Sequence, residues 1–311
     1  MAEIAIMVEG QNGLNWPRWQ RIAQAVENLG FAGLFRSDHY TNANPPDLDS
    51  LELWVSLTWL ADHTRRIEFG PLVTPLSFRH PTMTARMAAA LDDLSGGRLV
   101  LGIGAGWQER EHKNYGWQLL DPQERFQRFE EGLQVIKRLL NDDRPVNFDG
   151  RFFHLEEAVV LPRPERLGGP RILVGGNGAR QTLRLTARYA DEWNAVYIPV
   201  EKFTQLNSRL DEMLAEEGRS ESSVRRSLMT GCVFGRDQGE VRREVEARTQ
   251  GKIDAGGLRE RGLLVGTPAE MIDQLERLSE AGVQRIMLQW LDLDDLESLQ
   301  ALAEGVLPHF R

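Results

Sequence analysis

An acid and a histidine, Asp38 and His39, directly follow a short apolar run near the start of the chain. Imidazole titrates near neutral pH, so His39 could act as a general acid, a general base or a hydrogen-bond donor. Adjacent strand residues point to opposite faces, so Asp38 and His39 cannot both face one interior while the strand stays regular. The alternative is that His39 caps the strand and Asp38 anchors the loop. We predict that both residues are catalytic.

Two later apolar runs end in proline and glycine. In GPLVTP, residues 70–75, Pro71 cannot donate a ladder hydrogen bond, so the strand must bulge or lie at an edge. A plain kink is the alternative. In LGIGAGW, residues 101–107, the glycines would let a ligand approach the backbone, or would simply form a tight strand exit. Their spacing does not match the dinucleotide-binding fingerprint.

A third glycine-rich segment, GGNGAR, spans residues 175–180 and joins an apolar run to a predicted helix. Free backbone N–H groups and the positive end of a helix suit an anionic phosphate, and Arg180 adds positive charge. Barrel enzymes often bind phosphate in such late loops. The alternative is a turn that uses glycine for its geometry alone.

Other chemistries have less support in the sequence. Glu109, Glu111 and His112 are predicted to form the solvated first turn of a helix. There is no Gly-x-Ser-x-Gly elbow, no phosphate-binding P-loop and no paired-cysteine motif, and the six histidines lack the spacing of a metal-binding helix. No metal is therefore expected.

Short apolar runs alternate with segments of helical period throughout the chain. The predicted strands are Ile4–Glu9, Gly33–Asp38, Ile67–Thr74, Leu99–Gly104, Arg171–Gly175, Glu192–Val196, Leu228–Phe234 and Arg285–Trp290. Eight strands alternating with helices favour a (β/α)8 TIM barrel, an α/β fold. A doubly wound sheet is the competing architecture, but it usually has fewer strands and places its nucleotide motif after the first one.

Two segments interrupt this alternation, at about residues 142–170 before the fifth strand and 251–266 after the seventh. The first is predicted to be a hairpin followed by a proline-rich loop. Excursions of this length often form lids or substrate walls. No linker is apparent, so residues 1–311 are expected to form a single barrel domain.

The charge balance excludes several classes of partner. With 37 Lys and Arg against 46 Asp and Glu, the formal net charge is −9, which disfavours nucleic acid and anionic membranes. No apolar stretch approaches the roughly 20 residues of a membrane span, and no signal peptide is evident. A single cysteine, Cys232, excludes an internal disulfide and suggests a cytoplasmic location.

Taken together, these segments resemble the bacterial luciferase-like flavin-dependent family, and its coenzyme F420 (deazaflavin) branch more closely than its FMN branch. The matching segments are GLFRSDHY, LVTPLSFRHP, LSGGRLVLGIGAGW, ILVGGNGARQTLRLTARYADEWNA and LVGTPAEMIDQLERLSEAGVQRIML. They run in family order from about residue 30 to 290. The resemblance implies a barrel with the cofactor ring across its carboxyl-terminal mouth.

The resemblance also implies roles for particular residues. Asp38 and His39 would lie near the ring. A non-prolyl cis peptide, aligned between Pro71 and Leu72, would support one ring face, and the Gly176–Arg180 loop would hold the cofactor phosphate. The predicted cofactor-binding residues are Pro71, Leu72, Thr74, Gly104, Gly106, Trp107, Gly175, Gly176, Asn177, Gly178, Ala179 and Arg180.

The resemblance leaves the reaction open. A glutamate that acts as proton donor in related sugar-phosphate dehydrogenases falls at Trp107, and the lysines that hold their sugar phosphate have no clear match. A glucose-6-phosphate dehydrogenase is therefore not predicted. We expect an F420-dependent oxidoreductase that moves hydride between the cofactor and a small organic substrate. The alternatives are an FMN-dependent monooxygenase served by a separate reductase, and a non-catalytic flavin-binding protein. A homodimer is expected from the family.

Overall fold

The computed structural model describes residues 1–310. Its main sheet is parallel and follows the order β3-β2-β1-β12-β10-β9-β8-β5-β4, with β11 paired to β10. The strands of this sheet are β1 (Glu3–Val8), β2 (Gly33–Arg36), β3 (Glu68–Pro71), β4 (Thr74–Pro75), β5 (Val100–Gly104), β8 (Arg171–Gly175), β9 (Glu192–Val196), β10 (Arg225–Phe234), β11 (Leu264–Gly266) and β12 (Arg285–Gln289).

The sheet closes on itself because β3 and β4, at the two ends of this order, are consecutive pieces of one barrel strand. A bridge between Phe69 and Leu99 joins β3 to the start of β5, and β4 pairs with β5 directly. Counting β3 and β4 once gives the eight predicted barrel strands. The closure excludes the doubly wound alternative and confirms the predicted fold class.

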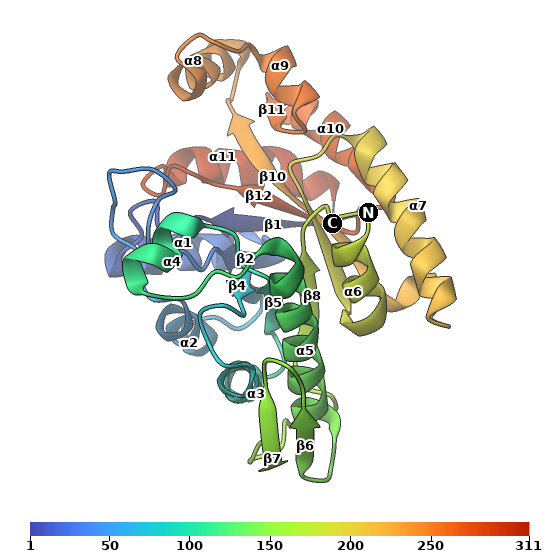
Figure 1. Cartoon of the computed structure of the whole chain (residues 1–311). Coiled ribbons are helices and arrows are strands. Elements are labelled where there is room, and N and C mark those ends of the chain that lie inside the picture. Colours follow the sequence, from blue (N-terminus) through green and yellow to red (C-terminus); the bar gives the residue numbers. More distant parts are fainter. Residues whose placement is uncertain (311) are drawn as a thin grey trace.

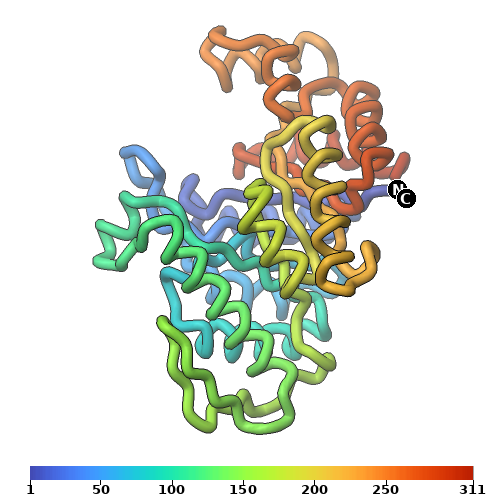
Figure 2. Tube along the Cα trace, turned by 45° about the vertical axis from the view of Figure 1, so that its right-hand side comes forward, coloured from blue at the N-terminus to red at the C-terminus, as the bar shows by residue number. Residues whose placement is uncertain are grey.

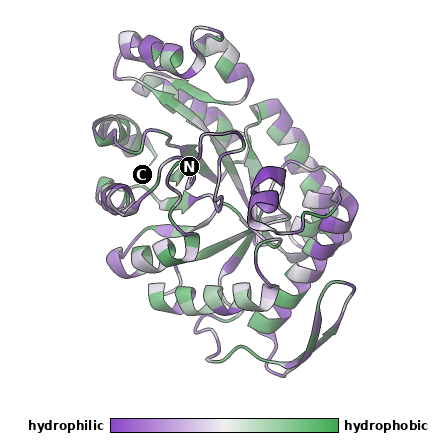
Figure 3. Cartoon of the chain, turned by 60° about the vertical axis from the view of Figure 1, so that its left-hand side comes forward, coloured by the Kyte–Doolittle hydropathy of each residue, from purple (hydrophilic) through white to green (hydrophobic). Residues whose placement is uncertain are grey.

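Helices surround the barrel, as Figure 1 shows. They are α1 (Trp16–Leu29), α2 (Leu53–His63), α3 (Pro81–Ser95), α4 (Glu109–Tyr115), α5 (Pro122–Asn141), α6 (Gln181–Tyr189), α7 (Val200–Glu216), α8 (Gln238–Thr249), α9 (Ala255–Glu260), α10 (Pro268–Glu280) and α11 (Leu296–Val306), with 3-10 turns η1 (Glu221–Ser223) and η2 (Leu307–His309). Helix α10 begins with a capping box between Thr267 and Glu270, with Pro268 in the first turn. In Figure 3 apolar residues gather on the strands and on the helix faces that cover them.

The two interrupting segments have different structures. The first contains the predicted hairpin, β6 (Val146–Asp149) paired antiparallel with β7 (His154–Ala158). The second contains α9 and β11, which pack with α8 around a small core of their own: Val233, Val241, Val245, Leu258, Leu263 and Val265. Figure 2 shows the hairpin and the α8–α9 segment at opposite ends of the molecule.

The barrel interior changes from charged to apolar along its axis. At the amino-terminal ends of the strands, the buried Arg285 pairs with Glu192 at 3.1 Å and also with Glu68 and Glu3. Above this charged group lies an apolar layer: Ala5, Met7, Phe35, Leu72, Val100, Leu173, Met229 and Met287. The ion pairs close the bottom of the barrel, so its interior opens at the carboxyl ends of the strands.

The cis peptide of the third barrel strand joins Leu72 to Val73, not Pro71 to Leu72 as predicted. Pro71 stays in register opposite Arg36, and the Leu72 N–H donates to the Arg36 carbonyl at 2.7 Å. The ladder with β2 therefore continues one residue beyond the proline, and the break comes after Leu72.

Candidate active site

A cavity of about 400 Å³ lies at the carboxyl ends of the barrel strands. Its size is in the usual range for a small-molecule site. Residues from seven of the eight barrel strands and the loops after them line it: Met7, Glu9, Ser37, His39, Leu72, Val73, Pro75, Gly106, Trp107, Gly175, Gly176, Asn194, Val196 and Met229. Six of the predicted site residues therefore meet here: His39, Leu72, Gly106, Trp107, Gly175 and Gly176.

His39 is held at the cavity wall by a buried carboxylate. Its Nδ1 lies 2.9 Å from Oε1 of Glu111, and the other carboxylate oxygen accepts a hydrogen bond from the Tyr40 backbone N–H at 3.2 Å. Glu111 is only 1% exposed. The indole of Trp107 contacts the imidazole edge to face, with the ring centres 5.6 Å apart. The carboxylate fixes the ring so that Nδ1 faces Glu111 and Nε2 is left for a group in the cavity.

The surroundings of His39 favour its protonated form. Burial, the largest single influence, lowers the pKa of His39. The hydrogen bond and the negative charge of Glu111, together with the charges of Glu9 and Asp38, outweigh burial, and the net pKa is raised. When protonated, His39 can donate a hydrogen bond or a proton from Nε2. When His39 is neutral and carries its proton on Nδ1 toward Glu111, its Nε2 can accept a hydrogen bond or a proton.

The prediction of a solvated turn at residues 109–112 is wrong for two of its three side chains. Glu109 is exposed, but Glu111 and His112 are buried. His112 donates from Nδ1 to the Gln108 carbonyl at 2.7 Å, and its Nε2 lies 2.8 Å from the Ser77 hydroxyl. Five successive charged or titratable residues, EREHK, form this segment, so its sequence contains no sign of which carboxylate turns inward.

Asp38 is not one of the residues that line the cavity. Its carboxylate accepts hydrogen bonds from the Thr74 hydroxyl at 2.7 Å and from Arg79 at 2.5 Å. Arg79 also donates to the Tyr40 hydroxyl and pairs with Glu52 at 3.0 Å. This buried network ties the loop after β2 to the third barrel strand. Asp38 and Thr74 thus lie behind the wall that carries His39, and a direct catalytic role for Asp38 stays a prediction.

Glycines of neighbouring strands make room for Val73, the residue after the cis peptide. A Cβ on Gly104 would lie 2.5 Å from Cγ2 of Val73, and one on Gly102 or Gly175 would lie 3.3 or 3.1 Å from Cγ1. Val73 and Leu72 line the cavity, whereas Gly104 and Pro71 do not. The glycine at position 104 therefore shapes the cavity through Val73, without bordering it.

A chain of polar groups runs through Glu9 and Ser37, which line the cavity. Burial raises the pKa of Tyr197 to about 12, so its hydroxyl stays protonated and donates to Gln289. Gln289 donates to Glu9 at 2.7 Å, and Glu9 accepts from Gln11 at 3.1 Å. Ser37 donates to Gln11 at 2.8 Å. Sequence analysis assigned no role to any of these residues, because they are ordinary polar residues at four separate strand ends.

The predicted phosphate loop lies beside the cavity at the start of α6. Asn177 folds back on the backbone, donating to the Val196 carbonyl at 2.7 Å and accepting from its N–H at 2.9 Å. Residues 177–180, including Gly178, Ala179 and Arg180, are exposed. Arg180 caps α6 without a side-chain hydrogen bond. The amides of this first turn and the Arg180 guanidinium could hold a phosphate that extends from the cavity.

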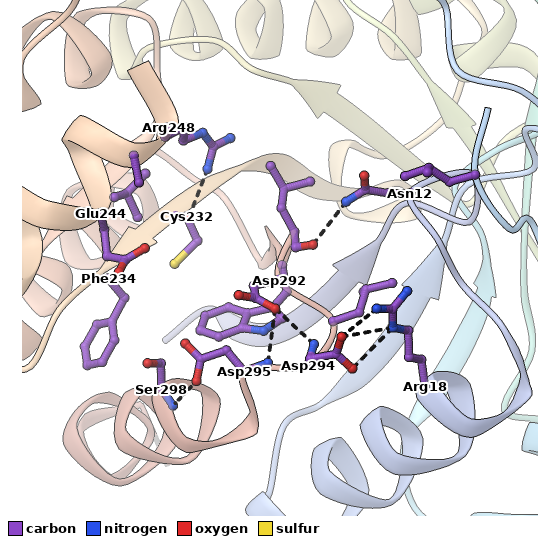
Figure 4. A pocket seen from close by; sticks show the side chains of 16 residues that line it. Asn12, Arg18, Cys232, Phe234, Glu244, Arg248, Asp292, Asp294, Asp295 and Ser298 are labelled. Atoms are coloured by element: carbon purple, nitrogen blue, oxygen red, sulfur yellow. Dashed lines mark hydrogen bonds and ion pairs between the residues drawn. The ribbon is translucent and has the colours of Figure 1, made fainter. Parts of the chain in front are cut away.

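A second cleft, of about 510 Å³, opens between the end of β10 and the loop after β12 (Figure 4). Asp294 pairs there with Arg18 at 2.6 Å, and Asp295 caps α11. Arg248 donates to the Cys232 carbonyl at 3.2 Å. Because these groups bind each other or the backbone, they hold the rim of this second cleft together.

TIM-barrel enzymes carry out their chemistry at the carboxyl ends of the strands, where the His39 cavity lies, and this chain is of that class. The family model described as luciferase-like monooxygenase matches residues 3–261. The chain belongs to this family, which confirms the resemblance found in the sequence.

Relatives with both kinds of chemistry match nearly the whole chain. The 4-hydroxyprotoasukamycin monooxygenase of Streptomyces nodosus subsp. asukaensis is 29% identical, covering 96% of this chain and 88% of that protein. The F420-dependent glucose-6-phosphate dehydrogenase of Kineococcus radiotolerans is 27% identical, covering 91% and 81%. The structure of an F420-dependent secondary alcohol dehydrogenase superposes with a TM-score of 0.86 at 19% identity, covering 100% and 99%, and shows the same fold. The relatives are oxidoreductases and monooxygenases, and this chain is an oxidoreductase of the family.

Two further observations bear on the expected partners. No helix within residues 1–310 is both long and apolar enough to cross a membrane. In the same residues, no three His, Cys, Asp or Glu side chains gather in a way that could hold a metal ion.

Proposed function

We propose that this chain is an F420-dependent oxidoreductase that transfers hydride between the deazaflavin and a small organic substrate. The observation that carries the proposal is the His39–Glu111 pair, whose free imidazole nitrogen lies at the wall of a largely apolar cavity. When bound, the reduced deazaflavin supplies a hydride from a ring carbon. A carbonyl that receives the hydride also needs a proton on its oxygen, and protonated His39 is placed to donate it from Nε2.

The remaining lining supports the same reaction. Met7, Leu72, Val73, Val196 and Met229 give the cavity apolar walls that exclude water, and so favour transfer to substrate over loss to solvent. Leu72 and Val73 would lie against the ring, and the Gly176–Arg180 loop would hold the cofactor phosphate. In the reverse direction, neutral His39 would accept the proton of an alcohol, and Glu111 would stabilise the resulting imidazolium.

The substrate is proposed to be neutral and organic. Trp107 stands where related sugar-phosphate dehydrogenases carry their acid, and its indole is 62% exposed at the cavity mouth. An indole cannot transfer a proton in the physiological range, so His39 is the proposed proton donor. The flat exposed ring would instead cover an apolar substrate.

The second candidate is an FMN-dependent monooxygenase, supported by the monooxygenase relative that covers 96% of the chain. Titration of purified protein with F420 and with FMN, followed by cofactor absorbance and fluorescence, distinguishes the two. We expect binding of F420. Tight binding of FMN without F420 binding, together with oxygen consumption when reduced FMN is supplied, would reverse the assignment.

The proton role is tested with His39→Ala. Loss of a general acid lowers turnover by about 10²- to 10⁴-fold, while F420 affinity should change little because the ring has other contacts. Turnover at the wild-type level would remove His39 from the mechanism.

We also propose that the protein forms a homodimer. Large apolar side chains are exposed on the adjacent helices α2 and α3: Val55 is 57% exposed, and Met83 and Leu94 are each 52% exposed. Burying such side chains against a second copy would be favourable. The mass in solution, measured by light scattering, tests this state.

A further inference from the structure

We propose that Asn194, on the cavity floor, accepts a hydrogen bond from the ring N–H of the bound cofactor. Asn194 belongs to β9, lines the cavity and is 1% exposed. Its Oδ1 has no hydrogen-bond partner among residues 1–310. The inference rests on the proposed function, because it takes this cavity as the site of the cofactor ring.

The neighbours of the amide decide which end is free. One end lies 3.0 Å from the Ser227 hydroxyl oxygen and 3.6 Å from the Met287 sulfur. The Ser227 hydroxyl gives its single hydrogen to the Trp193 carbonyl at 3.1 Å, and a thioether has none to give. Both neighbours therefore accept, and only the NH2 end of Asn194 complements them. The oxygen is the end left over.

An unpaired buried oxygen at this place points to a ligand. Buried polar side-chain atoms normally have a hydrogen-bond partner, because a buried polar atom without a partner destabilises the folded state. The other buried side-chain atoms without a partner in residues 1–310 are all nitrogens, and none of them lines this cavity. Most of the cavity lining, including Met7, Val196 and Met229, cannot donate a hydrogen bond, and the side chains that can, Ser37, His39 and Trp107, do not donate to this oxygen. We therefore expect the donor to come from the occupant.

Flavins and deazaflavins share one suitable donor. The uracil-like edge of both rings carries an N–H at N3 between two carbonyl groups. A single neutral acceptor such as Oδ1 of Asn194 complements that N–H without adding charge to an apolar floor. The inference therefore holds for F420 and for FMN, and it is independent of which of them the protein uses.

The test replaces Asn194 with Leu, which has a similar size and no acceptor, and with Ala as a second variant. Both are titrated with F420 and FMN, and the melting temperature of each ligand-free variant is measured. We expect affinity for the bound cofactor to fall about tenfold, as for loss of one hydrogen bond. The ligand-free melting temperature of Asn194→Leu should stay close to that of wild type, since the variant removes the unpaired acceptor together with the NH2 group, and the Ser227 hydroxyl keeps the Trp193 carbonyl as its partner.

Ser227→Ala is the matched control. It removes the partner of the Asn194 NH2 group and leaves Oδ1 in place, so we expect a lower melting temperature with cofactor affinity within about twofold of wild type. An analogue methylated at ring N3 provides the second readout. Wild-type protein should bind it about tenfold more weakly than the parent cofactor, and Asn194→Leu should bind both equally.

Three results would overturn the inference. The first is wild-type affinity in both Asn194 variants. The second is undiminished discrimination against the methylated analogue in Asn194→Leu. The third is a fall in melting temperature and affinity that Ser227→Ala reproduces, which would mean a purely structural role. If wild-type protein binds neither F420 nor FMN, the proposed function fails, and this inference fails with it.

Discussion

Replacing Glu111 with Gln removes the negative charge beside His39 and preserves the size of the side chain. Glu111 is 1% exposed and lies 2.9 Å from the imidazole Nδ1. Burial by itself lowers the pKa of His39, and the hydrogen bond and charge of Glu111 reverse this effect. In Glu111→Gln burial should dominate, so the pKa of His39 should fall.

The sign and size of the effect on stability follow from the raised pKa. A histidine whose pKa is raised by folding stabilises the protein fully below its unfolded pKa, about 6.5, and this contribution is lost as pH rises through the folded pKa. A buried hydrogen bond to a charged group contributes about 1.5–3 kcal/mol. The variant should therefore lose about that much free energy of unfolding near pH 6, and less near pH 9, because raising the pH through the folded pKa removes the proton from His39.

Chemical denaturation at the two pH values measures this difference, and NMR titration of the His39 ring proton measures the pKa directly. Glu109→Gln is the control, because Glu109 is exposed on the same helix. Glu109→Gln should change the free energy of unfolding by no more than about 0.5 kcal/mol at either pH. It should shift the pKa of His39 by no more than the equivalent of that energy. An equal loss of stability at both pH values, or an unchanged His39 titration, would refute the assigned ion pair.

Two further predictions concern the residues behind the cavity wall. Gly104→Ala places a Cβ 2.5 Å from Cγ2 of Val73, so unfolding free energy should fall by about 1–3 kcal/mol. Adding Val73→Ala to the Gly104→Ala variant should restore part of the lost unfolding free energy. If denaturant titrations show that the losses of the two single variants simply add, the contact between the two residues is contradicted. Asp38→Asn breaks the buried pair with Arg79 and should cost about 3 kcal/mol, while Asp47→Asn, in an exposed pair, should cost about 0–1 kcal/mol. Equal losses in the two variants, measured by the same titrations, would show that the Asp38 pair is not a buried one.

The strands and many of the helices could be predicted because the sequence patterns that indicate them are local. Apolar runs of strand length identified all eight barrel strands, with segments of helical period between them. Helix α9 lies in the 251–266 segment, which was expected only as an excursion. Helices α8 and α11 were also not predicted. The first is strongly charged, with only Val241 and Val245 buried, and the second follows a run of acidic residues that reads as a loop. The cis peptide, whose position was taken from the family resemblance, was placed one residue early, at Pro71–Leu72, and it joins Leu72 to Val73.

The sequence by itself determined that polar and glycine-rich segments follow the barrel strands, and hence that an active site lies at their carboxyl ends. It also determined the family, because the combination of motifs is specific in type and order. Only the tertiary structure decided which groups act together. Barrel closure placed Glu111 against His39, put Val73 in the space beside Gly104, and left one oxygen of Asn194 unpaired on the cavity floor. These outcomes depend on burial and on contacts between residues far apart in the chain, and local spacing carries no information about either.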